Sequence, residues 1–219
     1  MIEIAIDGTS ASGKGTLAKK LSEKYAIPHL DTGLMYRKVA SEILKKTDYN
    51  NLLESSCQIA KLSSFENLQN EELRTENIAQ MASKIAVFPA LRNMLKLKQK
   101  EFVYKSKEQF GGCVLDGRDI GTKILPNANF KFFIDASIEI RAKRRLLEKN
   151  ISFLHENDEK CMLQTLTEKM VERDNIDRNR EASPMLPAKD AFVIDTTSIN
   201  SDQLLSIATK LIEGNLLSN

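Results

Sequence analysis

The chain has 219 residues, enough for one large domain, and its apolar content of 42% can supply a sizeable core. The formal net charge is only +2, because 32 basic residues nearly cancel 30 acidic ones, and this balance argues against nonspecific nucleic-acid binding. Three widely spaced cysteines argue against a disulfide framework, and no apolar stretch approaches the ~20 residues of a membrane span, so we expect a soluble, cytoplasmic protein.

The first sixteen residues carry the pattern of a phosphate-binding loop. An apolar run over 2–6 predicts a strand, a helical pattern covers 14–25, and between them stand Gly8, Gly13 and Lys14. Glycines let backbone N–H groups turn toward a phosphate, the helix adds its positive end, and the lysine would bridge the outer phosphates. A glycine-rich turn with an incidental lysine is the plain alternative. The predicted loop comprises Gly8, Thr9, Ser10, Ala11, Ser12, Gly13, Lys14, Gly15 and Thr16.

The rest of the chain alternates short apolar strands with helices. In chain order we expect a strand over 27–30, a turn at 31–33, a helix over 34–45, short helices and loops over 47–73, helices over 76–87 and 89–105, and strands over 112–115 and 130–134. These are followed by a helix capped by Ser137 and running to 149, a long charged helix over 161–173 or beyond, a strand over 191–194 and a helix over 202–213.

Five such strands separated by helices predict a parallel sheet with helices on both faces, an α/β fold of the P-loop NTPase type. Ligands of these sheets bind beyond the carboxyl ends of the strands. Gly8, Asp31, Asp116 and Asp195 follow predicted strands and should gather at that edge.

Two segments at predicted strand ends could serve a phosphorylated ligand. Thr32 and Arg37 offer a hydroxyl and a guanidinium fork at a helix start, although a capping threonine with a solvent-facing arginine would look the same. The carboxylate of Asp116, next to Arg118 and Asp119, could order the waters of a Mg²⁺ ion beside the loop, and an ion-paired turn is the alternative.

Two further segments are rich in basic residues. Arg173, Asp177 and Arg180 are spaced to share one helical face, a pattern that plain surface salt bridges also produce. The run 141–145 has four basic residues, and its alternative is a solvated basic face.

Taken together, these segments resemble bacterial cytidylate kinase, a family of nucleoside monophosphate kinases. The shared motifs follow the family's order over nearly the whole chain. They are Ile6-Asp7-Gly8, Gly13-Lys14-Gly15-Thr16, Leu30-Asp31-Thr32-Gly33 with Tyr36-Arg37, Phe88-Pro89 with Arg92, Asp116-Gly117-Arg118-Asp119 with Gly121-Thr122, and Arg173-Asp174 with Asp177-Arg178-Asn179-Arg180.

The resemblance implies transfer of the γ-phosphoryl group of ATP to CMP or dCMP in pyrimidine metabolism, with Mg²⁺ on the phosphates. We also expect no direct metal ligand from the protein, a single domain that acts as a monomer, and no nucleic-acid or membrane partner. The resemblance also implies a layout in three parts: a core over 1–31, 106–143 and 156–219, a helical mononucleotide-binding segment over 32–105 and a mobile lid over 144–155.

The resemblance also assigns roles to residues at matching positions. The loop would bind ATP, Ser83, Arg92 and Asp119 would read the cytosine, and Asp177 would contact the sugar. An arginine can donate to O2 and N3 of cytosine, while a carboxylate can accept from its N4 amino group and would repel uracil. Thr32 and four arginines would hold the CMP phosphate, and two lid arginines would approach the transferred group. The clamp arginines are Arg37, Arg118, Arg173 and Arg180, the lid arginines are Arg144 and Arg145, and the expected catalytic set is Lys14, Arg118, Arg144, Arg145, Arg173 and Arg180.

The chain departs from the family pattern at several positions. Gly15 replaces the serine or threonine that binds Mg²⁺ in the general loop, so we expect Thr16 to contact the α-phosphate instead. Ile176 stands where some members carry arginine. The stretch over 47–75 is shorter than in long bacterial members and lacks a β-rich pattern, so we expect no complete three-stranded sheet there.

Two other functions fit part of the pattern. Another P-loop kinase, acting on AMP, UMP or a metabolite such as shikimate, would share the core and differ in the acceptor segment. A nucleotide-dependent switch or nucleic-acid binder would use the loop to sense ATP, but it has less use for dense arginine clamps.

Overall fold

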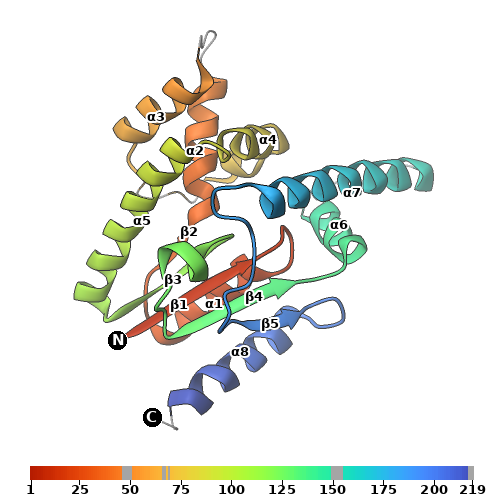
Figure 1. Cartoon of the computed structure of the whole chain (residues 1–219). Helices are drawn as coiled ribbons and strands as arrows, with labels where there is room; N and C mark the ends of the chain where they lie inside the picture. The colour runs from red at the N-terminus through yellow and green to blue at the C-terminus, as the bar shows by residue number, and fades with distance from the viewer. Residues whose placement is uncertain (46–50, 66–67, 69, 149–154, 217–219) are drawn as a thin grey trace.

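In the part of the chain that the computed structural model describes, five parallel strands form one sheet through the middle of the molecule (Figure 1). The described residues are 1–45, 51–65, 68, 70–148 and 155–216. The strands run in the order β2-β3-β1-β4-β5, and the predicted α/β fold class with a five-stranded parallel sheet is confirmed. Their bounds are β1 Ile2–Gly8, β2 His29–Asp31, β3 Gly112–Gly117, β4 Phe130–Asp135 and β5 Phe192–Asp195.

Helices connect the strands, and their ends follow local chemistry. Pro89 opens the longest helix before the third strand, where its missing N–H is not needed, and Gly111 ends it with a φ of 72°. Ser137 Oγ accepts a hydrogen bond from the Ile140 N–H at 3.4 Å, which confirms the predicted cap. The helices are α1 Lys14–Tyr25, α2 Thr32–Leu44, α3 Leu52–Leu62, η1 Glu71–Arg74 (3-10), α4 Glu76–Ile85, α5 Pro89–Phe110, η2 Ile120–Ile124 (π), α6 Ile138–Leu147, α7 Glu156–Asn179 and α8 Ser201–Leu216.

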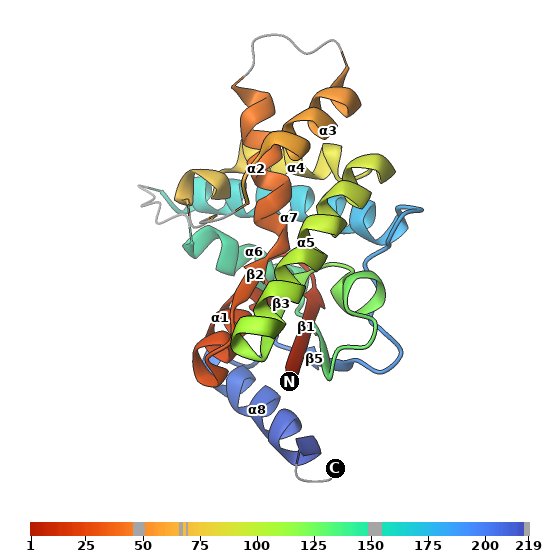
Figure 2. The ribbon, with the colours of Figure 1, turned by 90° about the vertical axis from the view of Figure 1, so that its left-hand side faces the viewer.

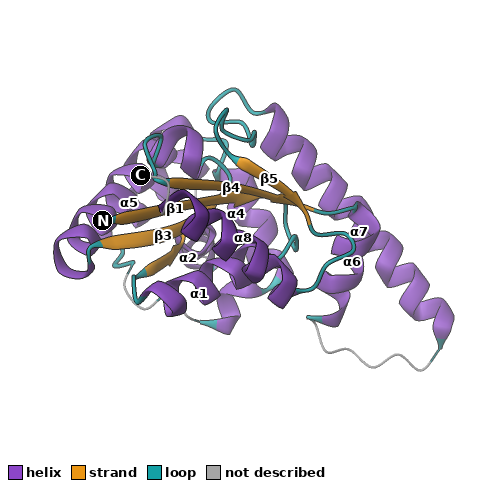
Figure 3. Ribbon diagram, turned by 90° about the horizontal axis from the view of Figure 1, so that it is seen from below, coloured by secondary structure: helices purple, strands orange, loops and turns teal. Residues whose placement is uncertain are grey.

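Each face of the sheet is covered by its own set of helices (Figure 3). Alternate residues of a strand point to opposite faces. Ile4 and Ile6 of β1 therefore pack with α1 and α8, while Ala5 between them packs with α2 and α5. The core on the first face lies between the sheet and helices α1 and α8, whereas the core on the second face extends from the sheet into the α2–α5 segment.

The start of α2 differs from the predicted turn at 31–33. Thr32 and Gly33 already belong to the helix, because Asp31 Oδ1 accepts a hydrogen bond from the Leu34 N–H at 3.3 Å and caps the first turn. Asp, Thr and Gly are also common in turns, so composition alone could not separate the two structures.

The stretch over 47–75 holds α3 and η1 and no strand among its described residues, as expected. Of the predicted lid over 144–155, residues 144–147 belong to α6, and 149–154 lie outside the described residues. Beyond the lid, α7 begins five residues earlier than expected and runs to Asn179.

Two groups of helices stand on either side of the carboxyl edge of the sheet (Figures 1 and 2). One group is α2, α3 and α4, which pack on one another, and the other is the antiparallel pair α6 and α7. Along the described ranges, no helix combines the length and apolarity needed to cross a bilayer.

Candidate active site

A polar cleft of about 420 Å³ opens at the carboxyl edge of the sheet, between these two groups of helices. The phosphate loop forms one wall, α2 and α4 a second, and α7 a third. A roomier pocket of about 600 Å³ lies on the outer side of α2, but its two lysines, Lys38 and Lys45, both pair with Glu42. The acidic and basic side chains that line the cleft are Lys14, Lys19, His29, Asp31, Arg37, Arg74, Arg92, Asp116, Arg118, Asp119, Arg145, Glu148, Arg173, Asp177 and Arg180.

The loop after β1 needs glycine where the sheet and the helix meet. Gly8 has a φ of 145°, and a Cβ on it would lie 1.9 Å from the Ile134 carbonyl oxygen. Gly13 has a φ of 93° and immediately precedes α1, so the helix N-terminus points its free N–H groups at the cleft. The loop residues that line the cleft are Ser10, Ala11, Gly13, Lys14, Gly15 and Thr16.

The other predicted loop residues support the loop from behind. Thr9 and Ser12 are fully buried, and Ser12 Oγ donates to the Thr9 carbonyl at 3.0 Å. Thr9 Oγ1 donates to Asp135 Oδ1 at 2.6 Å. Their side chains therefore fix the loop's shape and do not face a ligand.

Lys14 lies in the cleft beside a pair of carboxylates. Burial, reinforced by the charge of Arg118, lowers the pKa of Lys14 to about 8. Burial and the neighbouring Asp116 raise the pKa of Asp31. Against its own burial, Asp116 has its pKa lowered by His29, whose Nε2 lies 3.5 Å from Asp116 Oδ1, and by Lys14. The floor of the cleft thus holds one cation and at least one carboxylate that stays ionised.

Asp177 joins two of the predicted clamp arginines. Its Oδ2 accepts from Arg118 Nε at 2.8 Å, and its Oδ1 lies 3.3 Å from Arg180 Nη1. Arg118 also donates through Nη1 to the Gly8 carbonyl at 2.8 Å, and Arg180 donates through Nε to the Ser183 carbonyl at 2.6 Å. Both guanidinium groups are therefore held in fixed orientations at the cleft wall.

The same wall carries more positive charge than the described acids neutralise. The buried atoms Arg173 Nε and Arg180 Nη2 have no hydrogen-bond partner among the described residues. Burial, followed by the charge of neighbouring arginines, lowers the pKa of both residues, and it lowers the pKa of Arg37 to about 9. A buried donor without a partner costs free energy, so this cluster is arranged for an anion that brings several oxygens.

The far end of the cleft holds a buried ion pair beneath an aromatic ring. Arg92 Nη2 donates to Asp119 Oδ2 at 2.7 Å, and Nη1 donates to the Ala86 carbonyl at 3.2 Å. The Arg92 guanidinium lies 5.7 Å from the ring centroid of Tyr36, whose pKa burial raises to about 12. Ser83 of α4 lines the same end. Hydrogen-bonding side chains therefore line this end of the cleft.

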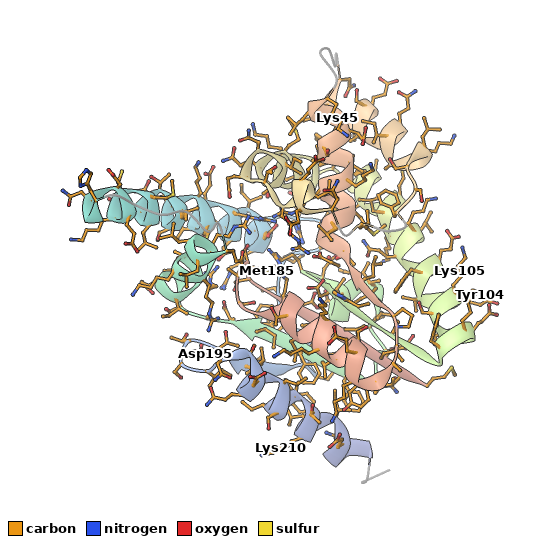
Figure 4. The ribbon with its side chains drawn as sticks, turned by 180° about the vertical axis from the view of Figure 1, so that it is seen from behind. Lys45, Tyr104, Lys105, Met185, Asp195 and Lys210 are labelled. Atoms are coloured by element: carbon orange, nitrogen blue, oxygen red, sulfur yellow. The ribbon has the colours of Figure 1, made fainter. Side chains whose placement is uncertain are left out.

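Three sequence expectations meet a different geometry. Thr32 lines the cleft, but its hydroxyl donates to the Asp116 carbonyl at 2.8 Å and so carries no free proton for a phosphate. Arg144 lies outside the cleft lining, because its Nη1 donates to Thr196 Oγ1 and its Nη2 to the Thr196 carbonyl, at 2.9 and 2.6 Å. Asp195 lies at the end of the outermost strand, away from the cleft, and its carboxylate is bonded to Thr197 (Figure 4).

Several lining residues were not singled out from the sequence. One of them, Arg74, is contacted by the predicted lid arginine Arg145, which reaches across to the α4 side, 3.2 Å from the Arg74 carbonyl and 3.8 Å from Glu76. Arg74 in turn lies 3.5 Å from Asp31. His29 stands two residues before Asp31, which ends β2, so both side chains lie on one face of the strand, and this spacing could have indicated that His29 also lines the cleft. Tyr36, next to Arg37 on α2, also lines the cleft.

Comparison with known proteins gives a consistent picture. The sequence model of the family described as cytidylate kinase matches residues 4–214. The cytidylate kinase of Bartonella quintana (strain Toulouse) is 40% identical over 210 residues, 96% of this chain and 94% of the relative. The cytidylate kinase of Methylocella silvestris is 39% identical over 210 residues, covering 96% and 93%. In fold alone, a crystal structure of an uncharacterized protein from Eubacterium ventriosum ATCC 27560 matches with a TM-score of 0.52 at 19% identity, covering 97% of this chain and 99% of that one.

Proposed function

The chain belongs to the cytidylate kinase family, and we propose that it transfers the γ-phosphoryl group of ATP to CMP or dCMP, giving ADP and the nucleoside diphosphate. One observation carries the proposal beyond family membership. Arg173 and Arg180 line the same cleft as the phosphate loop, and their buried atoms Nε and Nη2 have no hydrogen-bond partner among the described residues. One cleft therefore offers a triphosphate cradle and, across from it, a second site for a dianion.

The loop wall is the proposed donor site. The N–H groups at the start of α1 would bind the triphosphate, and Lys14 would bridge its outer phosphates. Burial lowers the pKa of this lysine, and the negative charge of bound phosphates would raise it again and keep the lysine charged. Thr16, which also lines the cleft, is the proposed contact to the α-phosphate.

Asp116 is the proposed partner of a Mg²⁺ ion. Among the described residues its buried Oδ1 has the 3.5 Å contact with His29 Nε2 but no hydrogen bond, and a Cβ added to Gly15 would lie 3.3 Å from Oδ2, so the carboxylate stands against the loop. No cluster of three or more His, Cys, Asp or Glu side chains suited to a metal occurs within the described ranges. One carboxylate beside a phosphate cradle fits a metal held mainly by phosphates and water. When bound, the ion would offset charge on the transferring group.

The arginine cluster is the proposed acceptor clamp. Arg173 and Arg180 would donate to the acceptor phosphate, and Arg118 and Arg37 would complete its charge neutralisation. Asp177 orients Arg118 and Arg180 through hydrogen bonds to its two oxygens. The same carboxylate is the proposed contact to the sugar of the acceptor nucleotide.

The Arg92–Asp119 pair is the proposed base reader, with Ser83 beside it. The 2.7 Å bond between the two side chains fixes a donor and an acceptor side by side. Such a pair matches the O2, N3 and N4 edge of cytosine, whereas the O4 of uracil would face a carboxylate.

The chemistry that follows needs positioning more than covalent help. The acceptor phosphate is already largely ionised near neutral pH (second pKa ~6), so no general base is required. The clamp would set its oxygen in line with the γ-phosphorus, and the surrounding cations would stabilise the charge spread over the equatorial oxygens. Arg145, which reaches across the cleft, is the proposed lid contribution, in preference to Arg144.

We also propose a monomer that works in a reducing compartment such as the cytoplasm. A single chain supplies the phosphate loop, the arginine clamp and the Arg92–Asp119 pair, and this supports the proposal of a monomer. Cys57, Cys113 and Cys161 are free thiols, as is usual where glutathione keeps thiols reduced.

A coupled ADP-release assay tests the proposal with ATP–Mg²⁺ and each of CMP, dCMP, UMP, AMP and shikimate. We expect strong turnover with CMP and dCMP and little with the others. Lys14→Met is the matched control that removes the donor-site cation. Turnover with another acceptor would overturn the base-site assignment, and silence with all five would overturn the kinase proposal.

A further inference from the structure

Three consecutive residues of the phosphate loop are each tied to the end of α7 through one charged side chain. The Gly8 carbonyl accepts from Arg118 Nη1 at 2.8 Å, and the same guanidinium donates through Nε to Asp177 Oδ2 at 2.8 Å. This first tie lies within the cleft and belongs to the clamp described above. The next two ties lie behind the loop.

The second tie runs through Asp135 at the end of β4. Thr9 Oγ1 donates to Asp135 Oδ1 at 2.6 Å, and Arg178 Nη2 donates to Asp135 Oδ2 at 3.2 Å. The same carboxylate accepts from the Ala136 N–H at 2.9 Å, which fixes its orientation at the start of the turn into α6.

The third tie runs through Arg141 of α6. Arg141 Nη1 lies 3.4 Å from the Ser10 carbonyl and 2.7 Å from Asp174 Oδ2, while its Nε donates to the Ala136 carbonyl at 2.9 Å. The Arg141 and Asp174 side chains are only 6% and 9% exposed. An ion pair this deeply buried is poorly screened, and removing one partner is costly, so it acts as a stiff connection.

The last turns of α7 therefore carry two sets of side chains. Asp174 and Arg178 connect to the back of the loop, while Arg173 and Asp177 line the cleft. A shift of the loop on binding a triphosphate would be transmitted to the helix that carries the clamp. The connection works in both directions, because binding free energies of two sites are coupled reciprocally.

We propose that Arg141 and Asp135 are positioning residues that couple the two substrate sites through α7, so that a nucleotide on the loop tightens the binding of CMP at the clamp. This inference rests on the proposed function. Neither residue lines the cleft, and both act on substrate only through the loop and α7.

Isothermal titration calorimetry measures the coupling directly. The Kd of CMP is determined without nucleotide and with saturating AMP-PNP–Mg²⁺, and the ratio of the two values is the coupling factor. For the wild-type protein we expect a factor of about 5 or more, within the range usual for coupled sites. A wild-type factor of one overturns the inference.

Two variants separate coupling from folding. Arg141→Met alone would leave Asp174 buried without its cation, so the double variant Arg141→Met/Asp174→Asn removes both charges. Arg178→Met removes a cation that is half exposed, which the fold tolerates. We expect the coupling factor to fall at least about threefold in the double variant and by a smaller amount in Arg178→Met.

Lys169→Met is the matched control, because Lys169 is an exposed cation on the same helix. We expect it to keep the wild-type factor. Wild-type coupling in both test variants overturns the inference. CMP turnover is measured on the same preparations, so a failed kinase proposal appears as absent turnover, whereas a failed inference appears as unchanged coupling in an active enzyme.

Discussion

Replacing Arg173 by methionine should make the ligand-free protein more stable and the enzyme much slower. Arg173 is half-buried, and its Nε is shielded from solvent without a partner among the described residues. Burial and the nearby Arg118 charge both lower its pKa, so the folded protein holds this cation at a cost. Methionine keeps most of the aliphatic stem and removes the charge.

The two effects can be estimated from the same geometry. A buried donor without a partner costs about 1–3 kcal/mol, part of which the variant regains. A net gain of about 1 kcal/mol corresponds to a rise in Tm of about 2–4 °C for a chain of this size. A donor that serves the transition state is worth about 3–4 kcal/mol, so kcat should fall about 10²–10³-fold.

Thermal unfolding and the coupled ADP-release assay measure both quantities on one preparation, with Lys169→Met as the exposed control on α7. We expect the CMP-induced rise in Tm of the wild-type protein to shrink in Arg173→Met. A ligand-free variant that melts several degrees below wild type would mean that Arg173 is paired and structural. Turnover within threefold of wild type would refute its place in the clamp.

Three further outcomes are expected. Burial and the charge of Arg118 lower the pKa of Lys14 to about 8, whereas bound ATP would favour the charged lysine. Above pH 8, nucleotide binding should therefore take up a proton, and the affinity should fall by up to about tenfold per pH unit. Calorimetry at pH 8.5 in buffers of different ionisation heat measures this uptake, and a result of no uptake would contradict the prediction. Asp119→Ala should cost CMP about 10–100-fold in kcat/KM while sparing UMP, and equal losses for both acceptors in the release assay would remove Asp119 as base reader. Asp7 accepts the N–H groups of Ile120 and Gly121 at 2.7 and 2.8 Å, so Asp7→Ala should lower the free energy of unfolding in urea by about 2–4 kcal/mol; a loss below about 0.5 kcal/mol would show that water replaces the carboxylate.

Local patterns were sufficient to predict the parts of the fold that local chemistry decides. Residues 14–25 were predicted as a helix with the observed bounds, because a glycine precedes it and an apolar stripe repeats within it. The arginines at 37, 118, 173 and 180 line the cleft as predicted, since strand ends and helix faces follow from periodicity. Their roles toward a substrate stay predictions.

The hydrogen-bond partners of polar side chains could not be predicted from the sequence. Thr32 donates to the carbonyl of Asp116, 84 positions away, and Arg144 turns to Thr196, 52 positions away. These partners depend on which acceptor groups the tertiary fold brings close without a partner of their own, and a local sequence motif does not contain that information. The charge surplus at Arg173 and Arg180 likewise emerges only when several segments meet.

The continuous core of the α2–α5 segment limits how this kinase could be re-engineered. Met35 and Val39 of α2, together with Leu91 and Leu95 of α5, belong to the same buried cluster as Ala5 and Leu115 in the sheet. An acceptor segment borrowed from another kinase would therefore have to match the sheet's own packing, and a cut at its sequence boundaries would pass through close-packed side chains. Changes of substrate are better sought by replacing single residues at the cleft surface than by exchanging the segment as a module.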